Sequence, residues 1–224
     1  MSPPEPRFPD QLPPPSLAIQ ARAVPLVMTV LALGVLGALI VSFAPRWVPL
    51  FTLQDFVILD GGELRMEPPA AALERREYWR LLTPAFLHFG IFHIVFNALW
   101  IWEFGRRIER LAGHGNFLLI FLVTAVGSNL GQQLWQPDEL FGGLSGVVYG
   151  LLGYLWFRHW LAPQPLSRLT PGILPLMLIW LLLCLSGVVD WFISGGIANG
   201  AHVAGLLIGI ALGAVAGVAA RNRL

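Results

Sequence analysis

Six stretches of this chain contain no Asp, Glu, Lys or Arg over lengths that matter for crossing a membrane. They are Ala23–Pro45, Leu81–Trp102, Leu111–Pro137, Leu140–Phe157, Leu169–Val189 and Phe192–Ala220. A helix that crosses a hydrocarbon core ~30 Å thick needs ~20 mostly apolar residues, because each residue rises about 1.5 Å. The stretches are continuously apolar rather than alternating, which disfavours the strands of a barrel. We therefore predict an all-α, polytopic membrane protein with six transmembrane helices.

The composition supports this interpretation. Charged residues make up 12% of the chain, hydrophobic residues 56%, and the mean hydropathy is +0.68. A soluble domain has ~25% charged residues, and its buried helices usually keep a polar face. The sequence therefore excludes a disordered chain and argues against a water-soluble globule. We expect a lipid bilayer, and no nucleic acid, as the partner of this surface.

The chain divides into three parts by composition. Residues 1–21 are rich in proline and have no apolar period, which predicts a disordered tail, followed by a six-helix domain over 22–220 and a short C-terminus over 221–224. The first apolar run starts late and is as long as a helix, unlike a secretory signal peptide. The connection Arg46–Ile91 mixes charges with aromatic side chains, which predicts a structured loop in the membrane interface between the first two helices.

The distribution of charge predicts an orientation. With six spans both termini lie on one side, and the segments on that side have an excess of Arg, whereas those on the other side have an excess of Asp and Glu. By the positive-inside rule both termini are expected in the cytoplasm. The single cysteine, Cys184, excludes an internal disulfide.

Polar residues inside predicted spans are costly and are candidates for function. His88, His93 and His202 fall in apolar surroundings towards the outer side, and Asn97 follows His93 by four residues, so both share one helix face. His114 and His159 lie beside Arg clusters at the cytoplasmic edge. We expect the last two to be snorkelling edge residues.

Ser145 lies in the sequence Gly142-Gly143-Leu144-Ser145-Gly146 at the start of an apolar run. From Ser145 to the charge at Arg158 there are about 14 residues, or about 21 Å of helix, which is too short for the hydrocarbon core. We therefore expect this helix to begin inside the membrane plane, with Gly142–Gly143 dipping in above it. Irregular backbone at that depth needs cover by protein or a water-filled cavity. The helix N-terminus there favours developing negative charge.

Glycines recur at a four-residue period in the last predicted helix. They are Gly205, Gly209, Gly213 and Gly217, and the helix that starts near Ser145 offers Gly146, Gly150 and Gly153 in return. Such small faces allow close approach of two helices, which would bring His202 to Ser145. A histidine within hydrogen-bond reach activates a serine hydroxyl. No third acid is placed to orient His202, since Asp190 lies at an edge, so a Ser–His dyad is expected.

Four blocks of this sequence stand out together. They are Trp79-Arg80 with His88 and His93-Ile94-Val95-Phe96-Asn97; Glu109 with Gly113; Gly143-Leu144-Ser145-Gly146-Val147-Val148-Tyr149-Gly150; and Asn199-Gly200-Ala201-His202-Val203-Ala204-Gly205-Leu206 with Gly209. In combination they resemble the rhomboid family of intramembrane serine proteases, in its six-helix form. The resemblance covers residues 22–220. One departure is Pro84, where some relatives have a histidine; it concerns the loop rather than the dyad.

The resemblance implies roles for individual residues. Ser145 would be the nucleophile and His202 the general base, and the Ser145 amide, His93 and Asn97 would form the oxyanion hole. Supporting roles are implied for Tyr149 packed on the His202 ring, Gly143 and Gly146 in the nucleophile block, Trp79 and Arg80 in the loop-one hairpin, His88 as a structural, water-binding residue, and Glu109 as a structural residue on the cytoplasmic side. Glu103 is unusual so near a span, and Arg106 and Arg107 at i+3 and i+4 are expected to pair with it.

The implied activity is hydrolysis of a peptide bond in or near a transmembrane helix of a single-pass or polytopic membrane protein, without cofactor or metal. The expected location is a bacterial inner membrane, with the site opening to the outer side. Two alternatives remain: a non-proteolytic rhomboid-like protein that binds clients, and a small membrane transporter in which His93, Asn97 and His202 line a pathway. A zinc protease is disfavoured because H-E-x-x-H does not occur.

Overall fold

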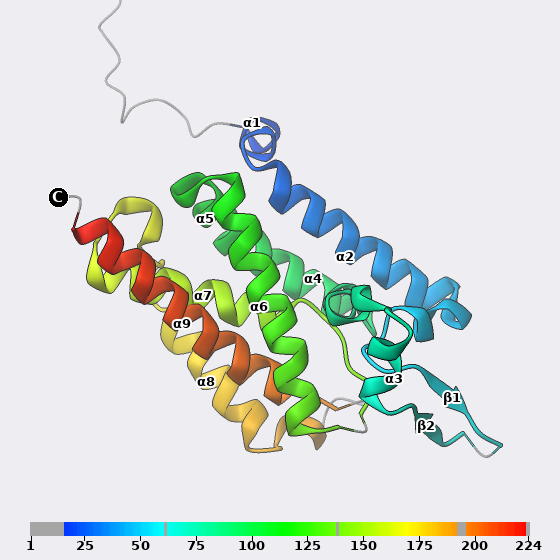
Figure 1. Cartoon of the computed structure of the whole chain (residues 1–224). Helices are drawn as coiled ribbons and strands as arrows, with labels where there is room; N and C mark the ends of the chain where they lie inside the picture. Colours follow the sequence, from blue (N-terminus) through cyan, green and yellow to red (C-terminus); the bar gives the residue numbers. More distant parts are fainter. Residues whose placement is uncertain (1–15, 61, 138, 192–195, 223–224) are drawn as a thin grey trace, which may run out of the picture.

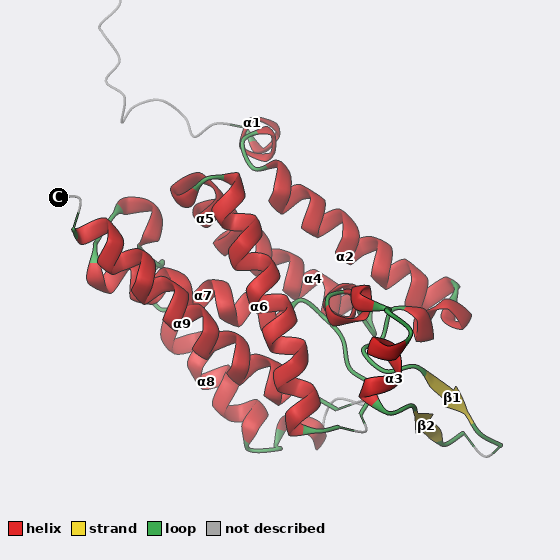
Figure 2. Ribbon diagram, in the orientation of Figure 1, coloured by secondary structure: helices red, strands yellow, loops and turns green. Residues whose placement is uncertain are grey.

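The computed structural model describes residues 16–60, 62–137, 139–191 and 196–222, and within these ranges the chain is mainly helical (Figures 1 and 2). The long helical elements are α2 (Pro25–Phe43), α4 (Ile91–Trp100), α5 (Arg106–Ala112), α6 (His114–Trp135), α7 (Ser145–Leu161), α8 (Ile173–Leu185) and α9 (Asn199–Arg221). The short elements are α1 (Leu17–Arg22), η2 (Pro45–Leu50), β1 (Phe56–Ile58), β2 (Leu64–Met66), α3 (Pro69–Glu74), η3 (Tyr78–Leu81), η4 (Thr83–Phe86), the π-helical turn η5 (Ile101–Gly105), η6 (Pro165–Ser167) and η7 (Val189–Trp191).

Three helices in the described part of the chain, α2, α6 and α9, are long and apolar enough to cross a membrane. The predicted second span is shorter at its start than its charge-free stretch. Regular helix begins at Ile91, because residues 78–86 form the two 3₁₀ turns η3 and η4. From Ile91 the elements α4, η5 and α5 follow one another without a break to Ala112.

The expected tail is wrong in its last part. Residues 17–22 form the short helix α1, where Ser16 accepts a hydrogen bond from the Ile19 amide at the N-cap. Residues 1–15 of the expected tail, and residues 223–224 of the expected C-terminus, lie outside the described residues.

Glu109 joins α5 to the start of α2. Its buried carboxylate accepts hydrogen bonds from the amides of Leu26 (3.0 Å) and Val27 (2.9 Å), in the first turn of α2, and lies 2.6 Å from His114 Nδ1. A carboxylate at a helix N-terminus satisfies amides that have no partner within the helix and favours the helix dipole. This contact fits the structural role that the resemblance implies for Glu109.

Two other expectations about charges can be compared with the structure. Glu103 pairs with both Arg106 (2.6 Å) and Arg107, as the spacing predicts. Arg158, which marked the end of the predicted helix that starts at Ser145, is buried and donates to the carbonyl of Ala162 at 2.5 Å. The helix α7 therefore continues past Arg158 to Leu161, because the guanidinium satisfies a carbonyl at the helix end rather than meeting water.

The centre of the fold is α7, which packs against α6 and α9 (Figure 1). All its residues from Gly146 to Leu155 are buried. A methyl group at Gly205 would overlap the carbonyl of Gly146, and one at Gly209 would overlap the carbonyl of Gly150. The glycine faces therefore bring the two backbones together, as the four-residue period predicts.

In the segment between α2 and α4, residues 45–60 and 62–90 are described, and its strands β1 and β2 project from the helices at one end of the molecule (Figure 1). Its β1–β2 hairpin is antiparallel, with Phe56 opposite Met66 and Ile58 opposite Leu64. After the hairpin the chain forms α3 and then η3 and η4, which lead into α4. We call residues 45–90 the connecting segment.

Candidate active site

Ser145 is the first residue of α7, and the turn that precedes it depends on glycine. Gly143 has φ +114°, a left-handed conformation that L side chains rarely adopt, and it donates its amide to the Pro84 carbonyl at 3.0 Å. A methyl group at Gly142 would meet the Pro84 carbonyl and the side chain of Leu87. The chain before Ser145 is thus packed directly on the end of the connecting segment.

His202 on α9 faces Ser145. Its Nε2 lies 2.8 Å from Ser145 Oγ, although the two residues are 57 positions apart. The His202 side chain is buried, whereas Ser145 is half-buried and so partly accessible. A hydrogen bond of this length is what activation of a hydroxyl by an imidazole requires.

The ring of His202 is positioned by packing rather than by an acid. The ring of Tyr149, one turn after Ser145, lies 5.0 Å from the His202 ring between centroids. The Tyr149 hydroxyl donates to the Met177 carbonyl of α8 at 3.0 Å, which fixes the tyrosine in turn. His202 Nδ1 has no hydrogen-bond partner among the described residues. Packing on Tyr149 is thus the contact by which the described residues hold this ring.

His93 and Asn97, on one face of α4, lie beside the turn that leads to Ser145. A methyl group at Gly143 would contact the His93 ring and come to 3.7 Å from Asn97 Nδ2. Asn97 is buried and donates one amide hydrogen to the His93 carbonyl at 3.0 Å. A primary amide has two hydrogens, so one remains for another acceptor. The structure thus places His93 and Asn97 close to Ser145 and His202.

His88 and Gly146 support the same turn from two sides. His88 is fully buried; its Nδ1 lies 2.9 Å from the Phe86 carbonyl, and its Nε2 lies 3.4 Å from the Leu144 amide. These contacts assign the proton to Nδ1 and leave Nε2 as acceptor. A methyl group at Gly146 would contact Ser128 of α6. The structural place expected for His88 fits these contacts, and its water-binding role stays a prediction.

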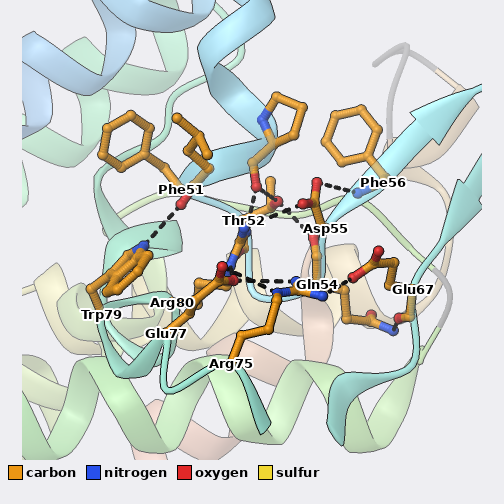
Figure 3. Close-up of polar contacts among 12 residues, drawn as sticks. Phe51, Thr52, Gln54, Asp55, Phe56, Glu67, Arg75, Glu77, Trp79 and Arg80 are labelled. Carbon is orange, nitrogen blue, oxygen red and sulfur yellow. Dashed lines mark hydrogen bonds and ion pairs between the residues drawn. The ribbon is translucent and has the colours of Figure 1, made fainter. Parts of the chain in front are cut away.

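Trp79 and Arg80 lie in η3, within the connecting segment and after its strands β1 and β2 (Figure 3). The Trp79 indole donates to the Leu50 carbonyl at 3.1 Å. The Arg80 guanidinium is buried and donates to the carbonyls of Pro49 and, at 3.1 Å, Thr52. These contacts stabilise the connecting segment.

Two carboxylates complete the surroundings of Arg80, and sequence reasoning did not select either of them. Glu77 pairs with Arg80 at 2.6 Å and Asp55 at 3.4 Å (Figure 3). Glu77 also pairs with Arg75 at 3.1 Å, and hydrogen bonds from Arg75 and Arg80 lower the pKa of the Glu77 carboxyl. An i+3 spacing was the only available signal for Glu77, and Asp55 is 25 residues away from Arg80.

The site brings together a serine hydroxyl, an imidazole and hydrogen-bond donors. In the described ranges no group of three or more His, Cys, Asp or Glu side chains could hold a metal ion. A polarised hydroxyl beside amide donors is suited to acyl transfer, in which an oxyanion forms and must be stabilised.

A family model of the Rhomboid domain matches residues 75–218, which is more than half of the chain and includes Ser145, His202, His93 and Asn97. The chain therefore belongs to the rhomboid family, and it is an integral membrane protein. Among similar curated proteins are those named Rhomboid protease GlpG from Salmonella choleraesuis (strain SC-B67) and Salmonella newport (strain SL254). Each is 42% identical over 147 residues, which cover 66% of this chain and 51% of the relative. The chain thus matches about half the length of these relatives.

Proposed function

We propose that this protein is an intramembrane serine endopeptidase that uses Ser145 as nucleophile and His202 as general base. The observation that carries the proposal is the 2.8 Å contact between Ser145 Oγ and His202 Nε2 at the start of α7. The relatives named Rhomboid protease support it, and the region that the family model matches contains both residues. A client-binding protein without activity would have no need for this contact.

The reaction follows from the geometry in two steps. His202 Nε2 accepts the Ser145 proton while Oγ attacks the carbonyl carbon of the scissile bond, and the oxyanion accepts hydrogen bonds from the Ser145 amide, His93 and Asn97. Collapse of the intermediate expels the amine, which takes the proton from His202, and leaves an acyl-enzyme. Water, deprotonated by His202, then releases the acid and regenerates Ser145. Packing against Tyr149 holds the imidazole in place throughout.

Six membrane spans fit this mechanism. We infer that α4–η5–α5, α7 and α8 cross or enter the bilayer beside α2, α6 and α9. At about 1.5 Å per residue the 17 residues of α7 extend about 25 Å, less than the hydrocarbon core. Ser145 then lies below the membrane surface, covered by the connecting segment in the interface, and reaches water through the same side.

The excess of Arg supports cytoplasmic termini and a Ser145 that opens to the outer side. From the minimal six-helix form we infer a bacterial inner membrane. The substrates we propose are single-pass or polytopic membrane proteins, cut in or near a transmembrane helix. No cofactor takes part in this chemistry.

Cleavage of a generic single-span substrate in detergent tests the proposal. We expect Ser145→Ala and His202→Ala each to lower the rate at least about a thousandfold, because they remove the nucleophile or its base. Ser128→Ala is a matched control, since the Ser128 hydroxyl is buried near Gly146 but donates to the Thr124 carbonyl of its own helix at 2.5 Å. The control should retain near wild-type activity. Equal cleavage by Ser145→Ala and wild type would overturn the mechanism.

A further inference from the structure

A cavity of about 300 Å³ lies between the end of α7 and the start of α8, and the proposed reaction does not use it. Its walls include Trp156, His159, Arg168, Thr170 and Leu174. Trp156 and His159 belong to the last turns of α7, whereas Ser145 is the first residue of that helix. The cavity is therefore at the opposite end of α7 from Ser145, and its volume is at the lower end of the range for small-ligand sites.

The wall formed by residues 168–170 is fixed to α5. Arg107 donates to the Arg168 carbonyl at 2.6 Å and to the Thr170 hydroxyl oxygen at 3.3 Å. Thr170 Oγ1 accepts this bond, so its own proton stays available to a ligand. On the other wall His159 Nδ1 is 3.0 Å from Ser167 Oγ, which fixes the imidazole ring. Hydrogen bonds thus hold both walls of the cavity in place.

The cavity is positively charged. The Arg168 guanidinium is exposed and makes no hydrogen bond or ion pair with any described residue. None of the residues that line the cavity is Asp or Glu. The nearby carboxylate of Glu103 is already paired with both Arg106 and Arg107. Arg168 and the Thr170 hydroxyl therefore offer donors to an anion that the protein itself does not supply.

The surface beside the cavity is apolar. On α8, just after the cavity wall, the side chains of Leu176, Ile179 and Trp180 are exposed by 57%, 57% and 46%. In an integral membrane protein such a surface meets acyl chains. A soluble anion would need the donors alone, whereas a lipid uses the donors and the apolar strip together.

We propose that this cavity binds the phosphate head group of one anionic phospholipid, with its acyl chains along α8. Arg168 and Thr170 would donate to the phosphate oxygens, and Trp156 would lie at the level of the head group. In the proposed orientation the cavity faces the cytoplasmic leaflet, where anionic lipids attract basic residues. The inference rests on the proposed function only for that choice of leaflet.

Native mass spectrometry of the whole chain in detergent tests the site, with phosphatidylglycerol as probe and phosphatidylcholine as the zwitterionic comparison. We expect one retained phosphatidylglycerol, preferred over phosphatidylcholine by about fivefold or more, the effect of one arginine at a charged surface. Arg168→Gln should abolish the preference and Thr170→Val should weaken it. Arg221→Gln, at the exposed end of α9 and outside the cavity lining, is the matched control and should keep it.

Three results would overturn the inference: equal retention of both lipids by the wild type, an equal loss in Arg168→Gln and Arg221→Gln, or displacement of the lipid by an equal concentration of inorganic phosphate. The last result would assign the cavity to a soluble anion. Ser145→Ala should bind phosphatidylglycerol as the wild type does, and Arg168→Gln should cleave substrate normally in lipid-free detergent. Failure of the lipid site is therefore separate from failure of the protease mechanism.

Discussion

The helices around Ser145 and the connecting segment are stabilised in opposite ways. We call α4, α6, α7 and α9 together the site helices; among them, α7 and α9 approach so closely that a methyl group at Gly209 would overlap the Gly150 carbonyl. In the connecting segment a single buried guanidinium, that of Arg80, contacts two carbonyls and two carboxylates. The stability of the site helices depends on glycines, which have no side chain. The stability of the connecting segment depends on one long charged side chain.

This difference has a physical reason. Between helices in lipid there is little hydrophobic driving force, so backbones gain from close van der Waals packing at small residues. Residues 45–90 contain turns whose backbone carbonyls have no regular partner, and a buried arginine with five donors can satisfy several of them. Changes in the site helices should therefore act through geometry, and changes in the connecting segment through unsatisfied polar groups.

The largest expected effect concerns catalysis itself. Asn97→Ala should lower the cleavage rate about 10²–10³-fold, or about 2.7–4 kcal/mol in the transition state, because it removes one oxyanion donor. Asn116→Ala is a matched control: the Asn116 amide donates to the carbonyl four residues before it, as Asn97 does, but it is exposed on α6. The measurement is the steady-state cleavage rate of each variant, compared with the wild-type rate. Equal rates in the two variants would remove Asn97 from the oxyanion hole.

The next effect tests the close packing. Gly209→Ala should lower the free energy of unfolding by about 3 kcal/mol, since the added methyl meets rigid backbone and has no free space. Gly115→Ala, in the first turn of α6, has nothing within 4 Å of the added methyl and should cause no loss. Unfolding of both variants in detergent provides the comparison. If Gly209→Ala were as stable as Gly115→Ala, helix approach would not depend on the glycine face.

A smaller effect is expected in the connecting segment. Arg80→Gln should lower the free energy of unfolding by about 2 kcal/mol, because buried carbonyls lose their donor while Glu77 and Asp55 regain water. Arg75→Gln, which removes an arginine exposed by 39%, should cost much less. The same unfolding measurement compares them. Equal losses would show that burial of Arg80 contributes nothing to the segment.

The smallest effect is a dependence on pH. The pKa of Glu77 is lowered from 4.5 in the folded protein by Arg75 and Arg80, so its ion pairs stabilise the protein above pH 4.5, and this contribution is lost as pH falls through the lower folded pKa. The difference in melting temperature between wild type and Glu77→Gln should thus be constant near neutral pH and shrink below pH 4.5. Glu74→Gln, which replaces an exposed glutamate at the end of α3, is the control for the substitution itself. A constant difference down to pH 3.5 would contradict the pairing.

Much of the helical site follows from sequence patterns, because they are local and periodic. The four-residue glycine period predicts the approach of α9 to α7, and with it the contact between His202 and Ser145. The glycine pair before Ser145 predicts the turn, and Gly143 has the positive φ that such a turn needs. Close helix packing and a positive φ both favour glycine, so both can be predicted from the positions of glycine in the sequence.

The connecting segment and the helix ends were harder to predict. The charge-free stretch that begins at Leu81 includes η4, so the absence of charge alone does not mark the start of α4, whereas the predicted connection Arg46–Ile91 does end there. Arg158 is charged but buried, and only the structure shows that its guanidinium satisfies a carbonyl of its own helix end. Glu109 contacts amides more than 80 positions away, and no pattern in one sequence reveals such a distant partner.

Covalent labelling of the serine tests the central claim most directly. A fluorophosphonate probe added to the protein in detergent, followed by mass spectrometry of the peptides, reports which hydroxyl is activated. The account predicts a single adduct on Ser145, which disappears in His202→Ala and persists in Ser128→Ala. Labelling at another residue, or undiminished labelling of Ser145 in His202→Ala, would contradict activation of Ser145 by His202.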